Sequence, residues 1–123
     1  RVKDALRRRG ENISSFEVEA TLINHHDVAE AAVHALGAQT GEDEIKATLV
    51  LREGAVVTHR ELCLWAIGQL PYFAVPRYFE FRTELPKNPT GRVLKYRLRD
   101  EGLTPDTWDR ESEGIEVRRP PRK

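Results

Sequence analysis

Apolar and polar positions recur along the chain with two periods, which predict strands in some segments and helices in others. Residues 45–51 alternate, and the shared apolar face is formed by Ile45, Ala47, Leu49 and Leu51. A period of two predicts a strand with one buried face. Residues 28–36 carry β-branched side chains and end before Gly37, which predicts a second strand. Because a short polar turn separates the two segments, we expect an antiparallel hairpin.

Two further extended segments are predicted. Residues 77–81 place Phe79 and Phe81 on one face and are predicted to form a third strand. Residues 1–9 are predicted to form a short strand or hairpin that leads to Gly10.

Helices are predicted where a capping box precedes helical spacing of apolar residues. Ser14 and Glu17 form an S-x-x-E box before residues 15–24, whose apolar members are Phe16, Leu22 and Ile23. Thr58 and Glu61 form a second box, followed by an apolar stripe of Leu62, Trp65, Ala66 and Leu70. This second helix is expected to end before Pro71, since proline cannot continue a helix.

The C-terminal part is predicted to contain a loop, a helix and a tail. The loop at residues 85–91 is rich in turn formers, and residues 92–102 have leucines spaced for a helix. Residues 103–123 lose all period and are expected to be a flexible tail. We therefore predict one α+β domain over residues 1–102, in which helices pack on a three-stranded sheet beside an N-terminal hairpin.

The composition excludes several classes of protein. The chain has 123 residues, which is one domain's worth, and no run of about 20 apolar residues that could span a membrane. A single cysteine, Cys63, cannot form an internal disulfide, is expected in the core, and favours a cytoplasmic location. Because the chain has no methionine and begins at Arg1, we expect a domain of a longer protein.

The net charge is +0, but the charges are unevenly distributed. Basic residues dominate residues 1–9 and 76–99, and the stretch between them is acidic. The neutral total argues against a nucleic acid held by bulk charge. The two basic segments form an anion site if the fold brings them together, and are solvated faces if it does not.

No complete catalytic or metal site is visible. The four histidines, His25, His26, His34 and His59, lack metal-ligand spacing with cysteine or carboxylates. No glycine-rich phosphate-binding motif is present. In the segment LPKNPTGRVLKYRLR, a stiff turn presents Arg92, with Lys95 three residues further on. A cation on a rigid loop can stabilise charge on a transferring phosphoryl or acyl-adenylate group, although a solvated basic turn has the same pattern.

Two segments, RVKDALRRRGENIS and LPKNPTGRV, resemble in order and separation the C-terminal domain of the acyl-adenylate-forming superfamily. PYFAVPRYFEF resembles the segment before the second motif. GENISSFEVE and TGRVLKYRLR are most similar to the carnitine/crotonobetaine-CoA ligase-like branch. The resemblance implies an acyl-CoA synthetase. In such an enzyme, ATP and a carboxylic acid are expected to form an acyl-adenylate and pyrophosphate. The domain is then expected to rotate as a mobile lid, and coenzyme A to attack the adenylate.

The resemblance also implies roles for individual residues. Arg1 matches an arginine near the nucleotide ribose, Lys3 matches the hinge, and Gly10 matches a glycine on the pantetheine passage. Our charge argument adds Arg7, Arg8 and Arg9 as partners of the coenzyme A phosphates. The missing N-terminal domain is expected to bind ATP with Mg²⁺, so this chain alone should be inactive and should hold no metal.

Arg92 occupies the position of the family's catalytic lysine, and this is the main departure from the family pattern. Arginine keeps the charge but is bulkier and forked. Either Arg92 contacts the carboxylate and α-phosphate, or Lys95 reaches in, or adenylation is weak. Two other functions remain open, namely the lid of a carrier-protein-loading adenylation domain and a non-enzymatic module that binds nucleic acid or another anion.

Overall fold

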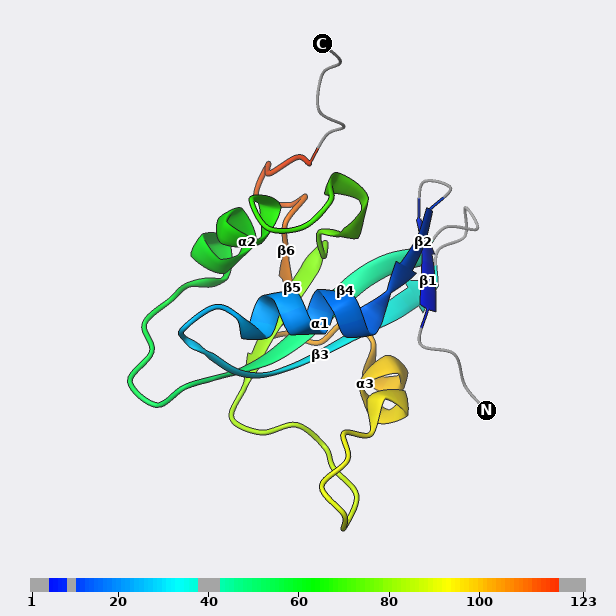
Figure 1. The fold of residues 1–123 in the computed structure, drawn as a ribbon, viewed down its shortest axis with the longest axis vertical. Coiled ribbons are helices and arrows are strands. Elements are labelled where there is room, and N and C mark those ends of the chain that lie inside the picture. The colour runs from blue at the N-terminus through cyan, green and yellow to red at the C-terminus, as the bar shows by residue number, and fades with distance from the viewer. Residues whose placement is uncertain (1–4, 9–10, 38–42, 118–123) are drawn as a thin grey trace.

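The computed structural model describes the backbone of residues 5–8, 11–37 and 43–117, and Figure 1 shows the elements along the chain. The strands are β1 (Ala5–Arg8), β2 (Glu11–Ser14), β3 (Val28–Gly37), β4 (Asp43–Leu51), β5 (Tyr78–Arg82) and β6 (Trp108–Asp109). The helices are α1 (Ser15–Ile23), α2 (His59–Ile67) and α3 (Lys95–Glu101), with a 3-10 turn at Tyr72–Ala74. The predicted α+β class is confirmed.

A mixed sheet in the order β3-β4-β5-β6 forms the centre of the fold, and β1 and β2 pair in a separate antiparallel hairpin. β3 and β4 form the predicted antiparallel hairpin, with Val33 opposite Ala47. β5 runs parallel to β4, and α2 lies in the crossover that a parallel pair requires. The predicted strand number of three was wrong, because β6 adds a fourth strand to the sheet.

The segment after α3 packs against the core, in contrast to the flexible tail predicted over residues 103–123. β6 pairs with β5, and the side chains of Arg110 and Ile115 are buried. Arg110 Nε donates to the carbonyl of Pro76, and Nη1 donates to that of Ile115. A two-residue strand and isolated anchors leave no period in the sequence, so the pattern could not indicate this packing. Residues 118–123 lie outside the described residues.

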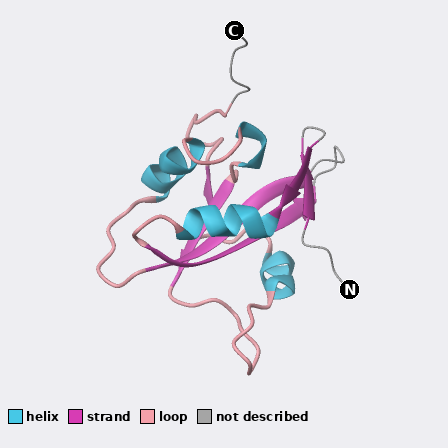
Figure 2. Cartoon of the chain, in the orientation of Figure 1, coloured by secondary structure: helices cyan, strands magenta, loops and turns pink. Residues whose placement is uncertain are grey.

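Helices cover both faces of the sheet, and Figure 2 shows α1 lying across the strands. On the first face, α1 and α2 pack against the apolar side of β3, β4 and β5. This core contains Val18, Leu22, Val33, Ala47, Leu49, Leu62, Cys63, Ala66 and Phe79. The predicted core position of Cys63 is confirmed, and burial raises the pKa of its thiol to about 11.

α3 covers the second face, where Leu98 packs with Ala32, Val50 and Leu85. The alternation of β4 predicts a polar outer face. That outer face is nevertheless buried, because the chain after β5 returns across it and Lys46 and Thr48 have no exposed surface. Burying a lysine is costly unless its charge is paired, so this face must contain a counter-ion.

The helices begin close to their predicted caps. Thr58 and Glu61 form the complete predicted capping box, whereas at α1 Ser14 Oγ accepts from the N–H of Glu17. The predicted apolar stripe of α1 was partly wrong, since Phe16 and Ile23 are exposed. Their places in the core are taken by Val18 together with the predicted Leu22. α3 begins at Lys95, after the loop that carries Arg92.

Candidate functional site

Arg92 lies at the end of a turn in the long loop between β5 and α3, which extends away from the sheet (yellow in Figure 1). Two backbone hydrogen bonds close the turn: Asn88 N–H donates to Arg92 O, and Gly91 N–H donates to Asn88 O, both at 2.9 Å. Gly91 has a φ of +90°, which side chains with a Cβ rarely adopt. The turn holds the backbone of Arg92 while its side chain is exposed to solvent.

The side chain of Asn88 fills the inside of this turn. Its Oδ1 accepts from the N–H of Thr90 at 3.0 Å, the N–H of Arg92 at 2.9 Å and the hydroxyl of Thr90 at 2.7 Å. An asparagine that bonds to backbone N–H groups just ahead of it is a strong turn former. The loop that presents Arg92 is therefore internally hydrogen-bonded.

The stem of the loop is attached to the sheet. Lys87 and Val93 form a β-bridge, and Leu94 N–H donates to Pro86 O at 2.8 Å. Lys87 Nζ lies 2.8 Å from the Glu30 carboxylate on β3. The bridge and the backbone bond fix the direction in which the turn leaves the domain.

Lys95, the other predicted cation, lies at the start of α3 and contacts α1. Its Nζ lies 2.6 Å from Glu19 Oε2 and 3.2 Å from Ser15 Oγ, and it lies above the ring of Phe16. Glu19 Oε2 also accepts from the N–H of Val33 at 2.7 Å. The Lys95 side chain is 16% exposed. Lys95 thus joins the start of α3 to α1 and to β3.

An open pocket of about 560 Å³ lies between α1 and α3 and reaches the Arg92 turn. Its lining includes the exposed aromatic residues Phe16 and Tyr96 and the cations Arg92, Lys95 and Arg99. The structure therefore brings Arg92 and Lys95 to one pocket, but only Arg92 has a largely exposed side chain.

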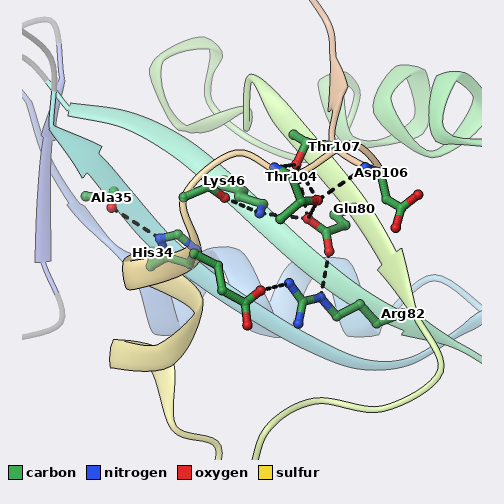
Figure 3. Close-up of polar contacts among 10 residues, drawn as sticks. His34, Ala35, Lys46, Glu80, Arg82, Thr104, Asp106 and Thr107 are labelled. Carbon is green, nitrogen blue, oxygen red and sulfur yellow. Dashed lines mark hydrogen bonds and ion pairs between the residues drawn. The ribbon is translucent and has the colours of Figure 1, made fainter.

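The far end of α3 is held by a buried ion pair on the second face of the sheet, shown in Figure 3. Lys46 Nζ on β4 lies 2.8 Å from Glu80 Oε1 on β5, and both side chains are almost fully buried. Lys46 Nζ also donates to the carbonyl of Gly102 at 2.7 Å. Glu80 is the counter-ion that the buried lysine requires, and the Gly102 bond ties the end of α3 to this pair.

Both oxygens of the Glu80 carboxylate accept hydrogen bonds. Thr104 and Thr107 donate their hydroxyls to Oε1, and Arg82 Nε donates to Oε2 at 2.6 Å. Burial alone would raise the pKa of Glu80, but hydrogen bonds from Lys46, Thr104 and Arg82 outweigh it and lower the pKa to about 2. Arg82 also pairs with Glu101 near the end of α3. The network fastens α3 and the following segment to the sheet.

His34 lies on the same face, opposite Lys46 in the β3–β4 register. Its side chain is fully buried, and Nδ1 lies 3.2 Å from the carbonyl of Ala35 (Figure 3). Burial, with the nearby charge of Lys46 as a further cause, lowers the pKa of His34 to about 4. Within the described residues, His34 Nε2 and Thr48 Oγ1 are buried without a hydrogen-bond partner. The imidazole is therefore neutral at neutral pH.

The remaining predicted site residues cannot be placed in the same detail. Arg1, Lys3, Arg9 and Gly10 lie outside the described residues, and for Arg7 and Arg8 only the backbone in β1 is described. Among residues 5–8, 11–37 and 43–117, no three His, Cys, Asp or Glu side chains come together as a metal site. No helix in those ranges is long and apolar enough to cross a membrane.

The sequence interpretation did not single out Asn88 or Glu19. The N-P-T-G pattern that starts at Asn88 is a recognisable turn signal. Nothing in the sequence distinguishes Glu19 from other helix-surface carboxylates, because its partners Lys95 and Val33 are distant along the chain.

Known proteins are similar to this chain in sequence and in fold. A 2-methylpropanoate–CoA ligase from Humulus lupulus is 39% identical over 102 residues, which is 81% of this chain and 18% of the ligase. A crotonobetaine/carnitine–CoA ligase from Salmonella arizonae is 31% identical over 94 residues, 76% of this chain and 18% of that protein. An acyl-CoA synthetase structure from Brucella canis superposes with a TM-score of 0.75 at 35% identity, covering 82% of this chain and 19% of the synthetase.

The chain thus spans about a fifth of the length of these relatives. The family model of the AMP-binding enzyme C-terminal domain matches residues 17–92, from the first turn of α1 to Arg92. The resemblance found in the two sequence motifs is confirmed, and this chain belongs to the family of AMP-binding enzyme C-terminal domains.

Proposed function

We propose that this chain is the C-terminal lid of an ATP-dependent acid–CoA ligase, which forms an acyl-adenylate and then an acyl-CoA thioester. The observation that carries the proposal is an exposed Arg92 on a hydrogen-bonded turn beside an open pocket, within a domain of the AMP-binding family. The relatives named as CoA ligases support the thioester product. The acid itself is selected outside this domain.

In the proposed first step, Arg92 binds the carboxylate and α-phosphate oxygens while the acid attacks the phosphorus and pyrophosphate leaves. A guanidinium can donate two parallel hydrogen bonds to such oxygens and keeps its charge at any working pH. A cation already held in place stabilises the charge that develops in the transition state without reorganising. The hydrogen-bonded turn and the anchored α3 supply that rigidity.

Between Arg92 and Lys95, we assign the contact with the α-phosphate to Arg92. Lys95 already neutralises Glu19 and bonds to Ser15, so using it in catalysis would leave a mostly buried carboxylate without its cation. Arg92 reaches the substrate without breaking such contacts, because its side chain is exposed.

The second step is proposed to use the N-terminal edge of the chain. Lys3 is the hinge, Arg1 approaches the ribose, Gly10 lines the pantetheine passage, and Arg7 to Arg9 face the coenzyme A phosphates. The partner in both steps is the enzyme's own N-terminal domain, which binds ATP and Mg²⁺.

The mobile unit is the predicted domain 1–102 together with the packed segment to residue 117. We place the enzyme in the cytoplasm and propose no nucleic-acid partner.

The test uses the full-length enzyme and measures pyrophosphate release. The acid panel contains 2-methylpropanoate, butyrate, a long-chain fatty acid and cinnamate, because relatives carry these substrate classes in their names. Arg92→Ala should lower the rate at least about tenfold, Arg92→Lys should retain most of it, and Lys95→Ala should lower it less. If Arg92→Ala does not lower adenylation about tenfold, the assignment is wrong.

The same enzyme separates the competing functions. Coenzyme A should discharge the acyl-adenylate, whereas transfer only to a carrier protein would identify a carrier-loading enzyme. Binding of DNA or RNA that weakens steeply with salt, without pyrophosphate release, would identify an anion-binding module.

A further inference from the structure

We infer that Asn88 is a positioning residue for the adenylation step, acting through Arg92; this inference rests on the proposed function. Its Oδ1 is the common acceptor for the N–H groups of Thr90 and Arg92 and for the Thr90 hydroxyl. The hydrogen bond to Arg92 N–H, 2.9 Å long, acts on the residue whose side chain enters the active site.

The turn needs this acceptor because its backbone bonds alone leave two N–H groups inside it. Asn88 and Arg92 are joined by the bond from Asn88 N–H to Arg92 O, and Gly91 N–H donates to Asn88 O. The N–H groups of Thr90 and Arg92 are satisfied by the Asn88 side chain. Without Oδ1 these groups turn toward water, and the turn gains alternative conformations around the flexible Gly91.

The effect should be local. The backbone bridge between Lys87 and Val93 holds the loop stem, and Lys95 and Lys46 hold α3. Removing the Asn88 amide leaves all of these contacts in place. The domain should therefore stay folded while the direction of the Arg92 side chain becomes less defined.

The consequence should fall on one chemical step. Misplacing a catalytic group by about 1 Å can lower a rate about a hundredfold. Asn88→Ala should therefore lower kcat for adenylation by about ten- to a hundredfold, with the KM for ATP changed less than about threefold. Thioester formation uses the other face of the lid in the proposed cycle, so it should change less than about threefold.

The experiment compares three variants of the full-length enzyme. Asn88→Ala removes the acceptor, and Asn88→Asp keeps a carboxylate oxygen in its place, so it should restore most of the rate. Lys87→Ala is the matched control, because it removes an ion pair from the same loop without touching the Asn88 oxygen. Pyrophosphate release is measured with the acid panel, and thioester formation is measured from synthetic acyl-adenylate and coenzyme A.

A double variant tests whether Asn88 acts through Arg92. If it does, Asn88→Ala combined with Arg92→Ala should be no slower in adenylation than Arg92→Ala alone. Additive losses in the double variant would overturn the inference. Equal losses of adenylation rate in Asn88→Ala and Lys87→Ala would also overturn it, as would a low adenylation rate in Asn88→Asp. A loss of thioester formation in Asn88→Ala as large as its loss of adenylation would overturn it too.

The failure of the inference and the failure of the proposed function give different results. If Arg92→Ala leaves pyrophosphate release unchanged, the proposed role of Arg92 fails and the inference fails with it. If Arg92→Ala lowers the rate and Asn88→Ala does not, only the inference about Asn88 is overturned.

Discussion

Lys46 Nζ and Glu80 Oε1 lie 2.8 Å apart on adjacent parallel strands, with almost no exposed surface on either side chain. The same ammonium bonds to the carbonyl of Gly102, just after α3. This pair joins the sheet to the helix that follows the Arg92 loop. A charged group at this depth is tolerated only while its partners stay in place.

Loss of the lysine should therefore be costly. We expect Lys46→Met to lower the free energy of unfolding by about 3 kcal/mol, since Glu80 keeps its charge and loses the fully buried one of its two cations. Urea unfolding of the 123-residue chain measures this change. The partly exposed pair Lys87–Glu30 provides the control, and Lys87→Ala should cost less than about 1 kcal/mol. Equal costs for the two variants would contradict the role of the buried pair.

We expect the free energy of unfolding to fall in acid because His34 is buried as a neutral imidazole. The pKa of His34 is about 4 in the folded chain, whereas an ordinary histidine, as in the unfolded chain, has a pKa of 6.5. Between these two pH values the unfolded chain therefore binds more protons than the folded chain. The contribution of His34 is complete above pH 6.5 and is lost as the pH falls toward 4. It amounts to about 3 kcal/mol at most.

The measurement compares urea unfolding of the original chain and of His34→Gln from pH 7 to pH 4. The variant has no imidazole to titrate, so the stability difference between the two chains should change across this range in the direction that favours the variant at low pH. Glu80 titrates lower, from its ordinary pKa of 4.5 down to about 2, and its contribution is common to both chains. A constant difference would show that His34 is not protonated on unfolding.

Local patterns predicted the parts of the fold that depend on neighbouring residues. The alternation in residues 45–51 predicted β4, and the capping box at Thr58 predicted the start of α2. The N-P-T-G turn and its cation were also visible, because turn chemistry is set within a few residues.

Features that depend on distant residues could not be predicted in this way. The alternation places Lys46 on a solvent face, and only the return of the chain over that face shows that it is buried. The sequence leaves Lys95 open as a catalytic cation and does not reveal its contact with Glu19, from a helix far earlier in the chain. The strand β6 has only two residues, Trp108 and Asp109, which are too few to produce a period in the sequence.

The thiol of Cys63 should be unreactive in the folded chain. It is buried in the core on α2, and burial raises its pKa from 9.0 to about 11, which lowers the thiolate fraction about a hundredfold. Labelling with a disulfide reagent at pH 8 should therefore be at least about a hundredfold slower than in urea. Rapid labelling without denaturant would mean that α2 opens far more easily than its packing indicates.

Arg92 and Lys95 should differ as clearly in their contribution to the free energy of unfolding as in their contribution to catalysis. Lys95→Ala removes the cation beside Glu19 and a bond to Ser15, so it should lower the free energy of unfolding by about 2 kcal/mol. Arg92→Ala changes an exposed side chain and should stay within about 0.5 kcal/mol. Urea unfolding of both variants, followed by pyrophosphate release with the full-length enzyme, separates the two roles. A destabilising Arg92→Ala together with a neutral Lys95→Ala would reverse the assignment, because the cation that is free to reach the substrate should be the one that the fold does not need.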